Sequence, residues 1–134
     1  CGRWQTLGTS PLVICDTGHN VGGWNYLSKQ IKGVACDRLR MVFGMVDDKD
    51  INHVMELLPK NAVYYFTQAT THRAIPSEDV MRMGMSHGLS GRCYKSVGAA
   101  YDAAMKDAKE NDFVFVGGSS YIVADLLTCL SRVN

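Results

Sequence analysis

Short apolar stretches alternate with segments of helical periodicity five times along this chain, and this alternation limits the possible folds more than any other feature. The stretches contain at most five residues and are rich in Val, Ile, Phe or Tyr, as strands covered on both faces are. They are Leu12–Cys15, Leu39–Phe43, Ala62–Phe66, a weak one at Arg92–Tyr94, and Phe113–Val116. We therefore expect an α/β domain with an open, mostly parallel sheet and helices on both faces.

The segments between these stretches have apolar residues at spacings of three and four, as amphipathic helices do. Their stripes are Trp24, Leu27 and Ile31; Ile51, Val54, Met55 and Leu58; Val97, Ala100, Tyr101, Ala104, Met105 and Ala108; and Val123, Leu126, Leu127 and Leu130. A further helix is expected over Ser77–His87, closed by Gly88, and Asp50 and Ser96 are predicted N-caps. Residues 1–11 are expected to form a lead-in segment or an edge strand around Trp4–Leu7.

Length and composition indicate one domain over residues 1–134, and the absence of an initial Met predicts that it belongs to a larger protein. The 14 basic and 13 acidic residues argue against a nucleic-acid partner, and no apolar run approaches the roughly 20 residues of a membrane helix. Five cysteines without a CxxC pair fit neither a disulfide framework nor a zinc site, so a reducing, cytoplasmic compartment is expected. Cys15 and Cys129 are predicted to be small buried apolar residues.

The loop after the first apolar stretch, Asp16–Gly23, is the leading candidate for a binding site. Ligands of open parallel sheets bind at the carboxyl ends of the strands, where Asp16 and His19 could face one pocket. The carboxylate could accept hydrogen bonds from ribose, and His19 could contact an anion or move a proton. In the alternative, Asp16 and Asn20 only cap the following helix and His19 is a surface residue. A metal site is not favoured, because no third ligand is obvious.

Three other loops carry polar residues after predicted strands. Gly117-Gly118-Ser119 either brings backbone close to a ligand or is a glycine turn with Ser119 as an N-cap. Gly44–Asp50 is either a polar loop that contributes to a site or a solvated loop with an N-cap. In Thr70–Pro76, Arg73 either binds a substrate carboxylate through two hydrogen bonds or is a surface arginine.

Several nucleotide and hydrolase motifs are missing from the sequence. There is no GxxxxGK[ST] phosphate loop and no GxGxxG turn, since Asp16 stands where that turn needs glycine. Ser119 is not the nucleophile of a GxSxG elbow, because Tyr121 replaces the second glycine. His53 and His87 lie on predicted helices and are expected to be structural.

Gly2-Arg3-Trp4-Gln5, followed by Pro11-Leu-Val-Ile-Cys-Asp16-x-x-His19-Asn20, resembles the start of the C-terminal domain of the folylpolyglutamate synthase/dihydrofolate synthase family, relatives of the Mur ligases. Further matching segments extend the resemblance over nearly all of the chain; they are Phe43-Gly44-Met45, Asp48-Lys49-Asp50, Tyr65-Phe66-Thr67, His72-Arg73-Ala74 and Gly117-Gly118-Ser119. The family often has Asp-Gly-Ala-His-Asn-Pro where this chain has Asp16-Thr-Gly-His-Asn-Val21, and losing the proline relaxes the predicted helix start.

The resemblance implies a Rossmann-like C-terminal domain that closes on an N-terminal P-loop ATPase domain holding the ATP phosphates, Mg²⁺ and the pterin. ATP phosphorylates a dihydropteroate or folate carboxylate, and the amine of L-glutamate then displaces phosphate to form an amide. By the resemblance, Arg3 and Asp16 bind ATP, with Asp16 on the ribose. His19 and Ser119 line the glutamate side, where Asn20 and Arg73 are further candidates, and His19 is a possible catalytic residue.

The sequence leaves two other functions open. One is a stand-alone Rossmann-like module that binds a nucleotide or small anion without catalysis, and the other is a Mur-type enzyme acting on a cell-wall precursor. Because this chain has no P-loop, we expect it to be catalytically inactive by itself and to bind ATP weakly. Whether the whole enzyme makes dihydrofolate, lengthens polyglutamate tails or does both is not determined by these residues.

Overall fold

The computed structural model describes residues 3–47 and 50–133, and the order of its elements confirms the predicted alternation. Gly2, Asp48 and Lys49, which belong to the motifs above, lie outside the described residues. The strands are β1 (Gln5–Thr9), β2 (Leu12–Asp16), β3 (Leu39–Phe43), β4 (Val63–Phe66), β5 (Ser90–Cys93) and β6 (Phe113–Gly117). The helices are α1 (Val21–Lys32), α2 (Ile51–Leu57), α3 (Ser77–Ser86), α4 (Val97–Asp107) and α5 (Ser120–Val133).

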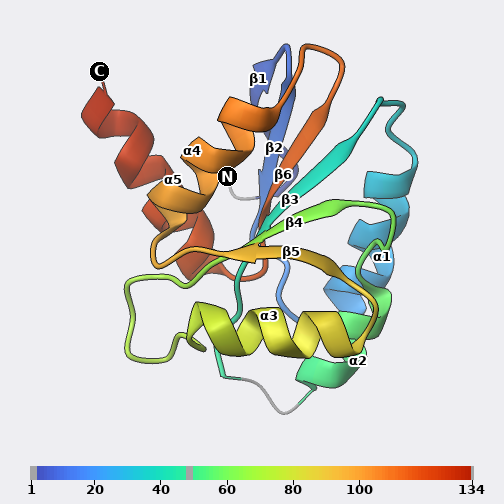
Figure 1. Cartoon of the computed structure of the whole chain (residues 1–134), viewed down its shortest axis with the longest axis vertical. Coiled ribbons are helices and arrows are strands. Elements are labelled where there is room, and N and C mark those ends of the chain that lie inside the picture. Colours follow the sequence, from blue (N-terminus) through green and yellow to red (C-terminus); the bar gives the residue numbers. More distant parts are fainter. Residues whose placement is uncertain (1–2, 48–49, 134) are drawn as a thin grey trace.

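The strands form a single sheet in the order β1-β2-β6-β3-β4-β5. Every neighbouring pair is parallel except β1 and β2, which are antiparallel, so the lead-in segment is the predicted edge strand. Asp16 and Phe43 both lie opposite Gly117, which aligns the carboxyl ends of β2, β6 and β3 at one edge. Figure 1 shows these strands as a twisted fan.

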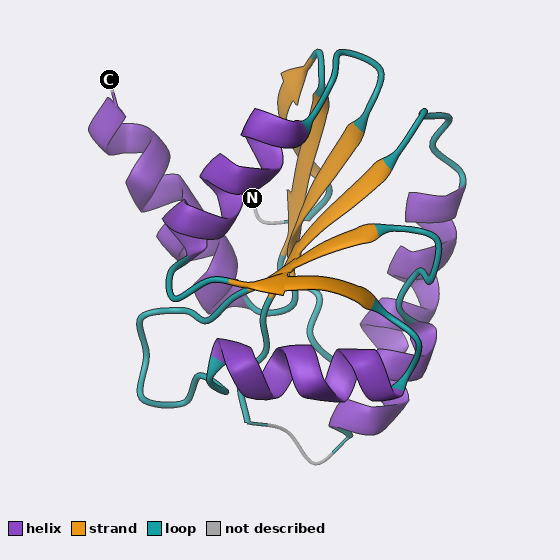
Figure 2. Cartoon of the chain, in the orientation of Figure 1, coloured by secondary structure: helices purple, strands orange, loops and turns teal. Residues whose placement is uncertain are grey.

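Helices cover both faces of the sheet, as predicted, and each face has its own apolar core (Figure 2). Trp24 of α1, Met55 of α2 and Val80 of α3 pack on one face, and the larger aromatic residues of the sheet point toward them. Ala100 of α4 and Leu126 of α5 pack on the other face. β2 and β6 are neighbours, yet the helices that follow them lie on opposite faces. Such a switch opens a crevice at the carboxyl edge, where ligands of these folds bind.

Glycines allow the three central strand ends to approach closely. Gly118 has a φ of 114°, and a Cβ there would lie 2.0 Å from the carbonyl oxygen of Gly44. A Cβ on Gly44 would lie 2.5 Å from the carbonyl oxygen of Thr67. Only glycine fits at these contacts, because a side chain would displace neighbouring backbone.

Four local predictions need correction. The weak strand is Ser90–Cys93 rather than Arg92–Tyr94, and the edge strand begins at Gln5 rather than Trp4. Asp50 occupies the N-cap position of α2, but its side chain makes no capping hydrogen bond to the helix. Cys129 is only half-buried, whereas Cys15 is fully buried as predicted.

Other helix ends agree with the sequence. Ser96 Oγ accepts a hydrogen bond from the Ala99 N–H at 3.1 Å, and Gly88 ends α3 with a φ of 85°. None of the helices in the described part of the chain is long and apolar enough to cross a membrane.

Candidate functional site

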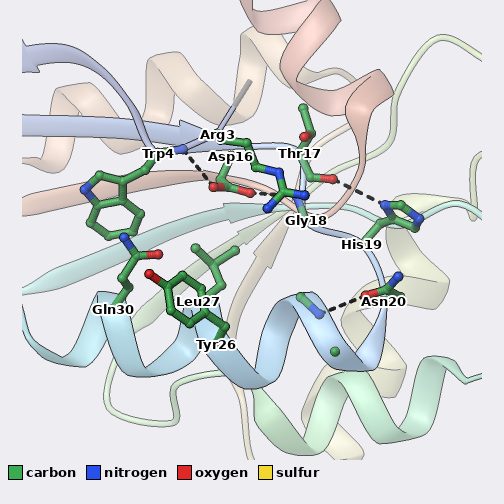
Figure 3. Close-up of a pocket in the computed structure, with 12 residues that line it drawn as sticks. Arg3, Trp4, Asp16, Thr17, Gly18, His19, Asn20, Tyr26, Leu27 and Gln30 are labelled. Atoms are coloured by element: carbon green, nitrogen blue, oxygen red, sulfur yellow. Dashed lines mark hydrogen bonds between the residues drawn. The ribbon is translucent and has the colours of Figure 1, made fainter. Parts of the chain in front are cut away.

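A pocket of about 520 Å³ opens at the carboxyl end of β2, where the crevice was expected. Its lining comes from the segment before β1, the β2–α1 loop and one side of α1; the residues are Arg3, Trp4, Asp16, Thr17, Gly18, His19, Asn20, Gly22, Gly23, Tyr26, Leu27 and Gln30. The structure therefore brings together four of the predicted site residues, Arg3, Asp16, His19 and Asn20 (Figure 3).

Asp16 is the acidic residue among those that line the pocket. Its side chain is 6% exposed, and each carboxylate oxygen accepts a main-chain hydrogen bond. Oδ1 accepts from the Gly18 N–H and Oδ2 from the Trp4 N–H, both at 2.8 Å. Neither donor belongs to the first turn of α1, so Asp16 shapes the loop and does not cap the helix. Each oxygen retains acceptor capacity for a ligand hydroxyl.

The bond from Trp4 to Asp16 holds the chain segment that carries Arg3 beside the pocket. Trp4 has a φ of 42°, which is unusual for a residue with a side chain. Its indole packs edge-on against Phe113 and tilted against Phe115, with ring centroids 6.2 and 6.4 Å apart. Arg3 is exposed and forms no ion pair within residues 3–47 and 50–133, so its charge is available to an anionic ligand.

His19 and Asn20 complete the loop in different ways. His19 is exposed at the pocket, and its Nδ1 lies 3.4 Å from the carbonyl oxygen of Thr17. Asn20 Oδ1 accepts a hydrogen bond from the Gly23 N–H at 2.8 Å, which makes Asn20 the N-cap of α1. The capping alternative is thus correct for the oxygen of Asn20, while its side-chain NH₂ group remains a donor.

Helix α1 contributes pocket residues that the sequence analysis did not select. Gly22, Tyr26 and Gln30 are spaced by four, so they form one row along the helix beside its buried stripe. The same four-residue spacing was present in the sequence. It was missed because only the apolar residues of this segment were considered.

Ser119 and Arg73 lie outside this pocket. Ser119 is 2% exposed, and its Oγ accepts from the Ile122 N–H at 3.2 Å, so it caps the start of α5. Arg73 is exposed in a second pocket of about 410 Å³, between the loops that follow β3 and β4. These loops are joined by an antiparallel bridge between Val46 and Ala74. Ser119 and Arg73 nevertheless lie at the carboxyl edge of the sheet, because they follow β6 and β4 respectively.

A partly buried polar network lies on the other face of the sheet. Arg40 donates to Asp112 at 3.1 Å and to the hydroxyl of Tyr65 at 2.9 Å, and Tyr65 donates to Asp107 at 2.8 Å. Burial and the bond to Asp107 raise the pKa of Tyr65 to about 12. Burial also tends to raise the pKa of Asp112, but the Lys109 N–H and the Arg40 guanidinium outweigh it and lower that pKa.

Comparison with known proteins identifies the family. Residues 2–120 match the family model described as Mur ligase, glutamate ligase domain. The chain belongs to this family.

Within the described ranges 3–47 and 50–133, no three His, Cys, Asp or Glu side chains are grouped so that they could hold a metal ion.

Among curated members related to this glutamate ligase domain, the dihydrofolate synthase/folylpolyglutamate synthase of Escherichia coli K12 is 36% identical over 129 residues. That match covers 94% of this chain and 29% of the relative. A probable bifunctional folylpolyglutamate synthase/dihydropteroate synthase of Haloferax volcanii is 30% identical over 134 residues, covering 98% of this chain and 16% of the relative. The chain thus spans less than a third of the length of these relatives.

Solved structures confirm the fold of the glutamate ligase domain. The chain superposes on E. coli FolC in complex with DHPP and ADP with a TM-score of 0.89 at 32% identity, covering 98% of this chain and 31% of that one. It superposes with a TM-score of 0.86 at 30% identity on a bifunctional folylpolyglutamate synthase/dihydrofolate synthase with Mn, AMPPNP and L-glutamate bound. That match covers 97% of this chain and 31% of the other.

Proposed function

We propose that this chain is the C-terminal domain of a two-domain, ATP-dependent ligase that joins L-glutamate to the carboxylate of a dihydropteroate or folate. The observation that carries the proposal is the meeting of Arg3, Asp16 and His19 at one pocket on the carboxyl edge of the sheet. The family match and the relatives' names support the choice of reaction. An N-terminal P-loop domain in the same protein is part of the proposal.

The residues of the pocket fit a nucleotide. The volume of about 520 Å³ lies within the usual size range of small-molecule sites, roughly 300–1,000 Å³. Asp16 is held in place by two main-chain donors and still has lone pairs for the ribose hydroxyls. Arg3 supplies a positive charge at the same pocket, where the phosphates would begin.

The glutamate side of the proposal rests on groups at the same edge. His19 and the NH₂ group of Asn20 face solvent at the pocket and can donate to a carboxylate. Arg73, in the neighbouring pocket, can bind a second carboxylate through two hydrogen bonds. The hydroxyl of Ser119 caps α5, so we propose that Ser119 acts by fixing the β6–α5 turn at the same edge of the sheet.

The chain contributes positioning and exclusion of water rather than phosphoryl chemistry. We propose that ATP, Mg²⁺ and the pterin bind mainly to the P-loop domain, and that closure of this domain brings Asp16 and Arg3 onto the nucleotide. Fixing two reactants in a closed site can lower a barrier by several kcal/mol. The isolated chain is therefore expected to have no ligase activity.

The odd number of cysteines supports a cytoplasmic location.

The proposal is tested by assaying the natural full-length protein for ADP release that requires both glutamate and a dihydropteroate or folate. Arg3→Ala should raise the KM for ATP about tenfold with an unchanged melting temperature, because Arg3 is exposed. Arg132→Ala, an exposed arginine on the last turn of α5, is the matched control. ATP binding without any glutamate-dependent turnover would instead favour a stand-alone nucleotide-binding module.

A further inference from the structure

The connection between β4 and α3, residues 67–76, carries His72 and Arg73 at the carboxyl edge of the sheet. Figure 1 shows it as the wide loop at the lower left, which leads from β4 to the start of α3. Both side chains are exposed, and the connection contains no helix. An exposed loop holds a binding side chain in a defined place only where its backbone is fixed to other elements.

The loop between β3 and α2 fixes the second half of this connection. Two main-chain hydrogen bonds, each 3.0 Å long, join the carbonyl oxygen of Arg73 and the N–H of Ile75 to that loop. They lie on either side of the antiparallel bridge between Val46 and Ala74. The backbone from Arg73 onward is therefore anchored on the side of β3.

Helix α5 fixes the first half of the connection from the other side. The Thr70 N–H donates to Oδ2 of Asp125 at 2.8 Å, and the two residues are 55 positions apart. Asp125 is half-buried on the second turn of α5, and it forms no ion pair in the part of the chain that the structure describes. Hydrogen bonds to an ionised acceptor are stronger than those between neutral groups. The carboxylate of Asp125 is thus a firm anchor for Thr70.

A tight turn carries Arg73 between the two anchors. The Arg73 N–H donates to Oγ1 of Thr71 at 3.3 Å, and the Ala74 N–H donates to the carbonyl oxygen of Thr71 at 3.1 Å. Because Thr71 directly follows Thr70, a displacement of Thr70 moves the base of this turn. The anchor on α5 therefore helps to fix the position of Arg73.

We propose that Asp125 is a positioning residue for L-glutamate, holding the turn so that the guanidinium of Arg73 meets a carboxylate of the incoming amino acid. The inference rests on the proposed function, which assigns that carboxylate to Arg73. Asp125 acts through the main chain of Thr70 and lines neither the pocket of Arg73 nor the pocket at the end of β2. Its loss should weaken glutamate binding and leave ATP binding unchanged.

Steady-state kinetics of the natural full-length protein test this role. Asp125→Ala should raise the KM for glutamate about fivefold, while kcat and the KM for ATP stay within about twofold of the wild type. Asp125→Asn keeps a side-chain oxygen that can accept from Thr70, so it should restore the wild-type KM. Asp102→Ala, which removes an exposed carboxylate from α4, is the matched control. An equal rise in the KM for ATP, or no rescue by Asp125→Asn, would overturn the proposal.

Hydrogen–deuterium exchange gives a readout that does not depend on the reaction. The amide of Thr70 should exchange faster in Asp125→Ala and at the wild-type rate in Asp125→Asn, because only the first variant removes the acceptor. Unchanged exchange in Asp125→Ala would show that this bond does not hold the turn.

A double substitution tests whether Asp125 acts through Arg73. In an Arg73→Ala background, Asp125→Ala should cause no further rise in the KM for glutamate. A further rise of about fivefold would show that Asp125 acts by another route, which would overturn the inference.

Arg73→Ala by itself separates failure of the inference from failure of the proposed function. If it raises the KM for glutamate and Asp125→Ala does not, the turn keeps its place without α5, so the inference fails while the glutamate site stands. If exchange at Thr70 accelerates in Asp125→Ala but neither substitution changes the KM for glutamate, Arg73 does not bind glutamate. The role proposed for Arg73 then fails, and the inference fails with it.

Discussion

The main-chain N–H of Trp4 donates to Oδ2 of Asp16 at 2.8 Å, joining two residues that are 12 positions apart. This bond ties the segment before β1 to the end of β2, and the second carboxylate oxygen ties the β2–α1 loop through Gly18. One acidic side chain therefore fixes two walls of the pocket. The proposed role of Asp16 in ribose binding is thus combined with a role in local structure.

Replacing Asp16 should loosen both walls. In Asp16→Ala, the Trp4 and Gly18 N–H groups lose their acceptor, which should cost about 1–3 kcal/mol of local stability. Hydrogen–deuterium exchange should accelerate at these two amides, and the KM for ATP should rise. Thr17→Ala, at the same pocket, is the control for a general effect of the loop. Unchanged exchange at Trp4 would show that the bond does not hold the segment.

His19→Ala should affect catalysis and leave the fold intact. His19 is exposed, and the hydrogen-bonding contact of its side chain with the carbonyl oxygen of Thr17 is local. In the full-length protein, kcat or the KM for glutamate should worsen at least tenfold, with a melting temperature within about 2 °C of the wild type. A large fall in melting temperature with normal turnover would assign His19 a structural role.

The polar network around Tyr65 predicts the stability of the chain at high pH. The pKa of Tyr65 is about 12 in the folded state and about 10 in an unfolded chain, so folding favours the protonated form. This contribution is complete below pH 10 and is lost as the pH rises from 10 to 12. Tyr65→Phe should reduce the loss of stability over that interval, as measured by urea denaturation. An unchanged slope would exclude Tyr65 as a source.

Gly118→Ala should strongly destabilise the chain. A non-glycine residue at a φ of 114° costs about 1–3 kcal/mol, and the Cβ would also press on the carbonyl oxygen of Gly44. Urea denaturation should therefore show a loss of more than about 2 kcal/mol. Gly33→Ala is the control, because Gly33 has a right-handed helical backbone and room for a Cβ, and its loss should be below about 1 kcal/mol.

The central strands were predictable because they are buried on both faces. β3 has the predicted bounds, and β6 exceeds them by one residue, since such strands are rich in apolar residues; in β3 only Arg40 is charged. β5 was misplaced because it is an edge strand with little apolar content. A Cβ on its Gly91 would lie 1.9 Å from the carbonyl oxygen of Tyr64, so the close approach of the two backbones requires glycine at this position. A glycine adds nothing to the apolar pattern from which strands are predicted.

The candidate site was predictable only in part. The position of Asp16 and His19 follows from the rule that loops after parallel strands meet at one edge. The bond from Trp4 to Asp16 was not predictable, because it depends on a positive φ and on the antiparallel return of β1. The contribution of Tyr26 and Gln30 required the orientation of α1 on the sheet, which periodicity alone leaves undetermined.

The crowded glycines at the ends of β3 and β6 have a consequence for how this domain can evolve. Because neither Gly44 nor Gly118 tolerates a Cβ, mutation cannot reshape the rim there without damaging the sheet. Helix α1 presents replaceable side chains to the same crevice. Divergence in ligand preference within such domains should therefore accumulate along the helix, while the glycine rim stays constant.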